Sequence, residues 1–325
     1  MPQVDQGRRF RKAGPGLEMN ADAEHMQERG PGIGPRLDSS RLLELRAKYE
    51  AFDDPRTAHA LWTDSYVADD LDLGAFRDDN VFLWQGRDGN VASSYLLTAY
   101  YYLSIGRSGL LEHMQEDGAF GAQTTMINDE RLLSRDLLDS VGEIAFLDDI
   151  LGISRWPQVR VLDIGAGYGR LAHRLIEAFP DTTSVATVDA VAESTFLSEF
   201  YLAYRGVDDR STVLELPSLD LWLGSEQVDV AVNVHSFSEC SFTVVRCWLD
   251  TIAESSIKFL MVVPNRGTHG GTRLLSRETD GTNTDYLPEL ERRGFELVAR
   301  RPKYLHSSVQ EYGVSPTYHW LFARE

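Results

Sequence analysis

The segment VLDIGAGYG, residues 161–169, decides the fold of this chain. Apolar, β-forming residues surround Asp163, and glycines follow at every second position, at Gly165, Gly167 and Gly169. Glycine lets a backbone turn sharply and approach a ligand closely. The segment therefore predicts a buried strand, a tight ligand-binding turn and the start of a helix.

A second acidic residue supports a nucleoside ligand at this turn. The β-rich run 184–188 ends at Asp189, 20 residues after Gly169, where a carboxylate can accept hydrogen bonds from both ribose hydroxyls. Dinucleotide-binding domains also have an acidic residue at this spacing, so Asp189 does not distinguish between the possible nucleoside ligands. Their GxGxxG pattern, however, needs glycine where this chain has Arg170, and it rarely has an acid two residues before its first glycine.

From about residue 158 onward, short β-rich runs alternate with helical runs, which is typical of βαβ units. We predict an α/β fold with a Rossmann-like, seven-stranded, mostly parallel sheet whose last two strands pair like a hairpin. The predicted strands cover residues 159–164, 184–188, 212–216, 228–234, 257–263, 295–300 and 317–323. The predicted helices cover residues 169–179, 193–204, 242–254 and 285–293.

The chain before this domain divides into two parts. Residues 1–36 are rich in glycine, proline and charge, which predicts a disordered or loosely attached arm. Residues 37–152 are mainly helical in pattern, and we expect them to form a cap region over the carboxyl edge of the sheet. The Rossmann-like domain itself is assigned to residues 153–325.

The composition of the chain limits the classes of partner that it is expected to bind. The net charge of −18 disfavours nucleic acid, whose binding depends on Lys and Arg contacts to phosphates. No apolar run is long enough for a membrane helix. Cys240 and Cys247, the two cysteines, suggest neither a disulfide framework nor a zinc site. We therefore expect a cytoplasmic protein acting on a small molecule, without nucleic-acid or membrane partners.

The 161–169 segment resembles motif I of class I S-adenosylmethionine-dependent methyltransferases, and the resemblance extends over about residues 158–325. Two further segments, NVHSFSE at 233–239 and SRDLLDS at 134–140, are similar to bacterial sugar O-methyltransferases. The resemblance implies S-adenosylmethionine as cofactor, with Asp163 toward its ammonium group, Asp189 on the ribose, and the helix that carries Ser134 over its methionine end. The implied cofactor-binding residues are Asp163, Gly165, Ala166, Gly167, Gly169, Asp189, Ala190, Leu216 (against the adenine), Asn233 and Ser134.

Methyl transfer to a hydroxyl requires a group that removes its proton, often a histidine, or a metal that lowers the pKa of the hydroxyl. His235 follows the fourth predicted strand, on the rim where ligands bind in open α/β sheets, and it is the predicted base. Glu239 is predicted to orient it or to bind a metal, and His269 is the second candidate base. The acidic chain is expected to raise the pKa of His235. A divalent metal is possible but not favoured, because no compact acidic pair falls clearly on the rim.

These patterns favour an S-adenosylmethionine-dependent O-methyltransferase acting on a sugar or a sugar-bearing metabolite. Amide and exocyclic amine methyltransferases usually carry an Asn/Asp-Pro-Pro-aromatic run after the fourth strand, and residues 233–236 depart from it. Two alternatives remain: an O- or N-methyltransferase of another small molecule, and a non-catalytic regulatory protein that binds the cofactor. The sequence leaves the acceptor and the oligomeric state open.

Overall fold

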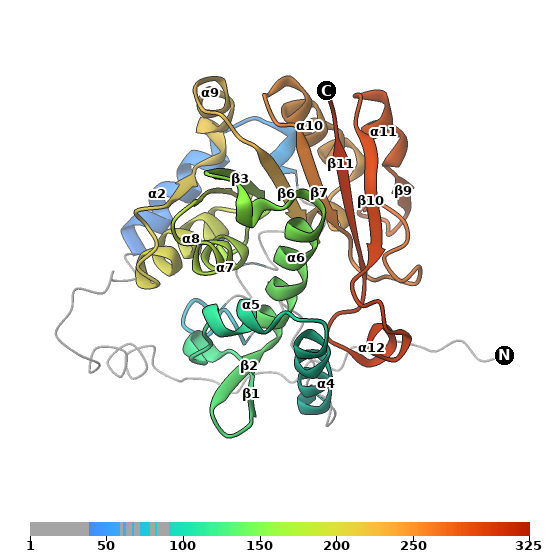
Figure 1. Cartoon of the computed structure of the whole chain (residues 1–325). Coiled ribbons are helices and arrows are strands. Elements are labelled where there is room, and N and C mark those ends of the chain that lie inside the picture. The colour runs from blue at the N-terminus through green and yellow to red at the C-terminus, as the bar shows by residue number, and fades with distance from the viewer. Residues whose placement is uncertain (1–38, 59–60, 63–66, 68–71, 79–81, 83–90) are drawn as a thin grey trace, which may run out of the picture. The chain divides into compact units, whose positions relative to one another are not determined.

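A seven-stranded sheet forms the centre of the computed structural model, which describes residues 39–58, 61–62, 67, 72–78, 82 and 91–325 (Figure 1). The predicted arm, residues 1–36, lies outside the described residues. The strands of the sheet are β3 (Val159–Ile164), β4 (Thr183–Val188), β5 (Ser211–Leu214), β6 (Val230–Val234), β7 (Phe259–Val263), β10 (Glu296–Pro302) and β11 (Tyr318–Ala323). Each overlaps a strand predicted from the sequence.

The strand order is β10-β11-β7-β6-β3-β4-β5. Only β11 runs antiparallel to its neighbours, so the predicted mostly parallel sheet with a terminal hairpin is confirmed. From β3 the chain adds β4 and β5 on one side, and then returns to add β6 and β7 on the other. The turns that follow β3 and β6 therefore diverge, and this opening is where ligands bind in open α/β sheets.

Helices connect the strands and cover the sheet, which explains why β6 and β7 are almost continuously apolar. These helices are α7 (Arg170–Ala178), α8 (Ala192–Tyr204), α9 (Leu219–Ser225), α10 (Phe242–Glu254) and α11 (Leu287–Arg292). The helices expected at 169–179, 193–204, 242–254 and 285–293 are all present.

The chain before β3 forms α2 (Ser39–Glu50), α4 (Val91–Ser104), α5 (Ser108–His113) and α6 (Arg135–Leu151). It also forms a hairpin that the helical prediction missed, of β1 (Thr124–Ile127) and β2 (Arg131–Ser134). Asn128 and Asp129 both adopt positive φ at its turn, a conformation these two residue types tolerate better than most. Four-residue strands are too short for their alternation to stand out from a helical pattern.

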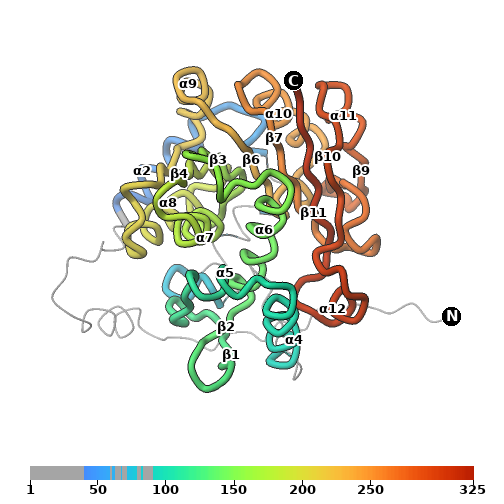
Figure 2. The backbone as a smooth tube through the Cα atoms, in the orientation of Figure 1, coloured from blue at the N-terminus to red at the C-terminus, as the bar shows by residue number. Residues whose placement is uncertain are grey.

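Whereas α2 packs against α8, the carboxyl ends of the parallel strands face α4, α5 and the β1–β2 hairpin (Figure 1). There α4 packs beside α12 (Ser307–Tyr312), a short helix in the connection between β10 and β11 (Figure 2). The connection after β7 contains a small hairpin of β8 (Leu275–Arg277) and β9 (Asn283–Asp285). Every helix of the described chain is too short or too polar to cross a bilayer.

Candidate functional site

The turns after β3, β4 and β6 meet at the reversal point of the sheet. Gly165 begins the first turn with φ of 70°, and a β-carbon there would lie 2.3 Å from Oγ of Ser236, in the turn after β6. Any other residue would push these two turns apart, so the first glycine of the motif serves their close approach.

A cavity of about 100 Å³ opens beside these turns, and we call it the glycine-loop cavity. Predicted cofactor residues Asp163, Gly165, Ala166, Gly167, Asp189 and Ala190 line it, together with Trp62, Phe82, Tyr168, Arg170, Leu171, Val191, Val234, His235, Ser236, Glu239, Cys240 and Trp248. The sheet therefore brings the motif, the second acid and the turn after β6 to one site.

Asp163 presents a carboxyl group to this cavity without a hydrogen-bond partner among the described residues. Its residue is 3% exposed. Burial raises the pKa of Asp163 to about 7, although the nearby Arg170 guanidinium acts in the opposite direction. Arg170 is itself paired with Glu143, with Nη1 2.8 Å from Oε2, so it does not neutralise Asp163 directly. A buried, unpaired carboxylate is costly, which suits a site that receives a cationic ligand.

Asp189 is held by the backbone. Its two oxygens accept hydrogen bonds from the N–H groups of Gly167 and Val191, each at 2.9 Å. Burial raises the pKa of Asp189 to about 6, although these hydrogen bonds oppose the shift. A carboxylate oxygen has two acceptor sites, so each can still receive a further donor such as a ribose hydroxyl.

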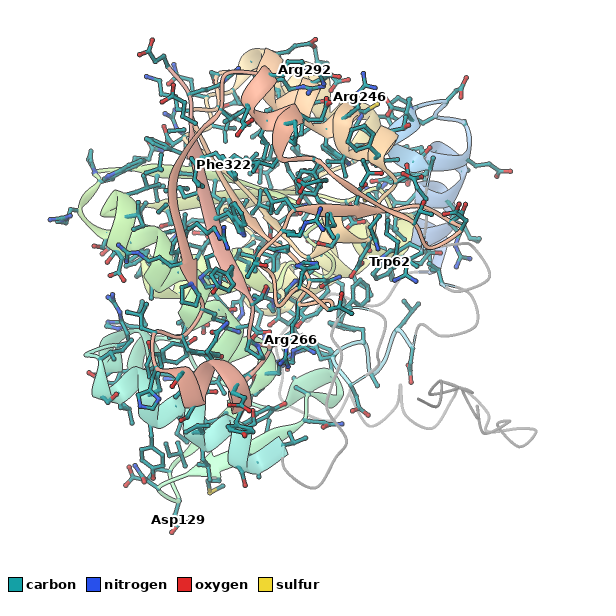
Figure 3. All side chains as sticks on the ribbon, turned by 90° about the vertical axis from the view of Figure 1, so that its right-hand side faces the viewer. Trp62, Asp129, Arg246, Arg266, Arg292 and Phe322 are labelled. Carbon is teal, nitrogen blue, oxygen red and sulfur yellow. The ribbon has the colours of Figure 1, made fainter. Side chains whose placement is uncertain are left out.

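Glu239 lines the glycine-loop cavity but does not hydrogen-bond to His235. Its carboxylate accepts from Trp62 Nε1 at 2.7 Å and from Asn265 Nδ2 at 3.1 Å. Burial raises the pKa of Glu239. Glu239 was predicted to orient His235, but no hydrogen bond joins the two side chains. Glu239 instead binds Trp62, which precedes α4 in the sequence. Figure 3 labels Trp62.

Two aromatic side chains limit the space in this cavity. Phe82 lies 3.0 Å from the position of a β-carbon on Gly167, directly over the glycine turn, and Trp62 lies 5.3 Å from it between ring centres. Ligand pockets usually measure about 300–1,000 Å³, well above the 100 Å³ present. A nucleoside ligand would therefore have to displace these two rings.

His235 lies at the end of β6 with φ of 68°, a rare conformation for a residue that is not glycine. Its backbone N–H donates to the Val263 carbonyl at 2.7 Å, which fixes the strained turn. The Nδ1 atom of its ring is buried without a partner. Burial lowers the pKa of His235 to about 3, and Arg135 and Arg170 lower it further. The expectation of a raised pKa is wrong, because burial disfavours the charged ring and the nearby cations add to that effect.

A second cavity of about 440 Å³ adjoins His235 on the other side, and we call it the arginine cavity. Its lining comes from five separate segments of the chain: Val91, Ser94, Tyr95, Arg135, His235, Asn265, Arg266, Gly313, Val314, Ser315, Pro316 and Thr317. His235 lines both cavities, so the two cavities meet at this residue.

Five predicted site residues do not line either cavity, and four of them, Ser134, Leu216, Gly169 and Asn233, have structural contacts instead. Ser134 caps α6 by accepting from the Leu137 N–H at 3.2 Å. Leu216 is fully buried, and its N–H donates to the Tyr49 hydroxyl at 3.1 Å. Gly169 lies under α8, where a β-carbon would meet Ser198 and Leu202.

Asn233 joins two of the turns. Its amide donates to the Ile164 carbonyl at 2.9 Å and accepts from the Phe237 N–H at 2.9 Å, so it supports the site from behind. His269, the second candidate base, is half-buried in the connection after β7. Among the described residues, no group of three or more His, Cys, Asp or Glu side chains is placed to hold a metal ion.

Sequence reasoning missed Trp62, Phe82, Arg135 and Arg266 as lining residues. Arg135 falls inside the quoted 134–140 segment, and Arg266 follows β7 in the loop that carries His269, so both were near positions already singled out. Trp62 and Phe82 carry no local motif, and only the folded chain places them over the glycine turn.

The chain matches no family model and no curated protein. Among solved structures it is similar to the magnesium protoporphyrin IX methyltransferase of Synechocystis PCC 6803 with bound SAM (12% identity, 71% of this chain, 97% of that chain, TM-score 0.41). It is also similar to the [4+2]-cyclase SpnF (16% identity, 71% of this chain, 96% of that chain, TM-score 0.42). A third similar structure is an O-methyltransferase family protein from Burkholderia thailandensis (11% identity, 74% of this chain, 74% of that chain, TM-score 0.40). The strand order and the glycine turn give the chain a Rossmann-like α/β fold with a mostly parallel seven-stranded sheet.

Proposed function

We propose that this protein binds S-adenosylmethionine in the glycine-loop cavity and methylates a hydroxyl group of a sugar or sugar-bearing small metabolite held in the arginine cavity. The observation that carries the proposal is the position of His235, which lines both cavities. A group that lies where the two cavities meet is placed to receive the proton that the acceptor loses.

The residues of the glycine-loop cavity fit this cofactor chemically. The unpartnered carboxyl of Asp163 would pair with the ammonium group of the amino-acid end, and Asp189 would accept the ribose hydroxyls. When bound, S-adenosylmethionine supplies an electrophilic methyl group on a sulfonium, which passes to the acceptor oxygen as its bond to sulfur breaks. The acids of this cavity also suit the positive charge of the sulfonium.

The ring of His235 would take up the hydroxyl proton. Because the pKa of His235 lies at about 3, the ring is neutral near pH 7 and a ring nitrogen can accept. Such a ring is a weak base toward an unreacted alcohol. As the new O–C bond forms, the hydroxyl becomes much more acidic, so a weak base suffices if proton transfer follows bond formation. His235 would then hold the proton until solvent removes it.

Two measurements test the proposal. Calorimetry should detect S-adenosylhomocysteine binding in preference to NADH, because Arg170 replaces the glycine that a dinucleotide turn requires. Labelled S-adenosylmethionine should then pass its methyl group to members of a sugar panel, and less to the phenols and amines tested beside them. Preference for NADH would overturn the cofactor assignment. Cofactor binding without transfer to any acceptor would favour the non-catalytic alternative, and transfer only to phenols or amines would overturn the sugar assignment.

A further inference from the structure

The arginine cavity has an unusual charge for this chain. Acidic residues outnumber basic ones by 50 to 32 in the sequence. Among the described residues that line this cavity, however, two are arginines and none is an aspartate or glutamate. A cation-lined cavity within an acidic protein is a local exception, and it concentrates positive potential where the acceptor would bind.

Arg135, the first residue of α6, is held in position by an ion pair within the same helix. Its Nε lies 3.2 Å from Oδ2 of Asp139, one turn later in the helix. Asp139 is also paired with the buried Lys303, whose Nζ donates to the Val314 carbonyl at 3.0 Å. One carboxylate thus contacts two cations, Arg135 and Lys303, beside the cavity wall.

Arg266 adds a second cationic side chain to the lining of this cavity. It follows β7, its side chain is exposed, and no carboxylate of the described residues forms an ion pair with its guanidinium. Figure 3 shows Arg266 at the level where the C-terminal strands meet the helical layer of α4 and α12. Burial is the main cause of the lowered pKa of His235, and Arg135, Arg170 and Lys303 lower it further.

We propose that the methyl acceptor carries an anionic group, a carboxylate or a phosphate, that Arg266 and Arg135 bind in the arginine cavity. Guanidinium groups bind both kinds of oxyanion through paired N–H donors. The volume of about 440 Å³ suits a molecule the size of an acidic or phosphorylated monosaccharide. This inference rests on the proposed function for the identity of the bound molecule as an acceptor.

Calorimetry with three probes tests the inference: glucuronate, glucose 6-phosphate and neutral glucose, each titrated with and without saturating S-adenosylhomocysteine. At least one anionic probe should bind tenfold or more tightly than glucose. The Arg266→Gln variant should lose that preference at least tenfold, and Arg266→Lys, which keeps the charge but not the planar fork, should retain part of it. A preference for one anion identifies carboxylate or phosphate as the recognised group.

Arg273→Gln is the matched control, because Arg273 lies in the same connection after β7, pairs with Asp285 at 3.4 Å and does not line the cavity. It should bind all three probes like the wild type. The inference is overturned if neither anion binds more tightly than glucose, or if Arg266→Gln keeps the full anion preference. Anion preference in a protein that does not bind S-adenosylhomocysteine would instead uphold the anion site and overturn the proposed function.

Discussion

The two cavities that meet at His235 differ in charge and in origin. The glycine-loop cavity is lined by Asp163, Asp189 and Glu239 and is built from turns that directly follow strands. The arginine cavity is lined by arginines and draws on five segments between residues 91 and 317. An acidic cavity suits a cationic cofactor and a basic one suits an anionic acceptor, so His235 lies at a boundary between opposite electrostatic environments.

The glycine-loop cavity contains a group that lowers the stability of the ligand-free protein. Asp163 is buried without a partner, and its pKa is raised to about 7 by that burial. On the acceptor side, in contrast, Arg135 already has Asp139 as a partner.

The largest effect is expected for His235→Ala. Turnover should fall by about 10²–10⁴, the usual contribution of a positioned acid–base group. The dissociation constant of S-adenosylhomocysteine should stay within about twofold, because the acids that would hold it are untouched. His269→Ala serves as the control and should retain activity, since His269 lines neither cavity. Steady-state kinetics with calorimetry check this, and the reverse pattern would make His269 the base.

The next effect concerns cofactor affinity alone. Asp163→Asn keeps the shape of the side chain and removes its charge, so S-adenosylhomocysteine should bind about 10–100-fold more weakly, as expected for one charged hydrogen bond. Binding of anionic probes in the arginine cavity should be unchanged. An unchanged affinity for S-adenosylhomocysteine in calorimetry would show that Asp163 does not contact the cofactor.

A smaller effect is expected from pH. The cofactor's ammonium group requires ionised Asp163, whose pKa in the free protein is about 7. Affinity for S-adenosylhomocysteine should therefore be nearly constant above pH 8 and fall about fivefold between pH 7 and pH 6, with Asp189 adding to the loss near and below its pKa of about 6. Calorimetry across pH 5–8.5 measures this, and Asp163→Asn should flatten the profile above pH 6.

The same pH series also tests His235. Because the pKa of His235 is lowered to about 3, turnover at saturating cofactor and acceptor should show no inflection near pH 6.5, the range of an unperturbed histidine. An inflection near 6.5 that disappears in His235→Ala would show that the ring titrates normally and that the cationic surroundings do not reach it.

The smallest effect is on stability. Burial raises the pKa of Asp163 above its unfolded value of 3.8, so the folded protein binds this proton more tightly and loses stability as pH rises from about 4 through 7. Asp163→Asn removes that cost, and the ligand-free variant should melt at least about 2 °C higher than the wild type at pH 8. The gain should shrink toward pH 5. Differential scanning calorimetry checks it, and a lower Tm at pH 8 would contradict the unpaired state of Asp163.

Much of the fold could be predicted from the sequence because its signals are local. The seven strands and four helices follow from alternating runs of β-forming and helical residues, and the glycine turn follows from spacing within nine residues. Asp163 and Asp189 could be placed for the same reason, since each ends a buried strand. The β1–β2 hairpin escaped because four-residue strands carry little periodic signal.

By itself, the sequence determined the sheet, its glycine turn and the two acids at its carboxyl edge. Only the tertiary structure decided that Leu216, Asn233 and Ser134 turn to structural contacts, that Glu239 faces Trp62, and that His235 lies among cations. It alone assembled the arginine cavity from distant segments. The physical reason is range: backbone turns and strand ends depend on neighbours in the sequence, whereas burial, pKa and the lining of a cavity depend on whichever segments the fold brings together.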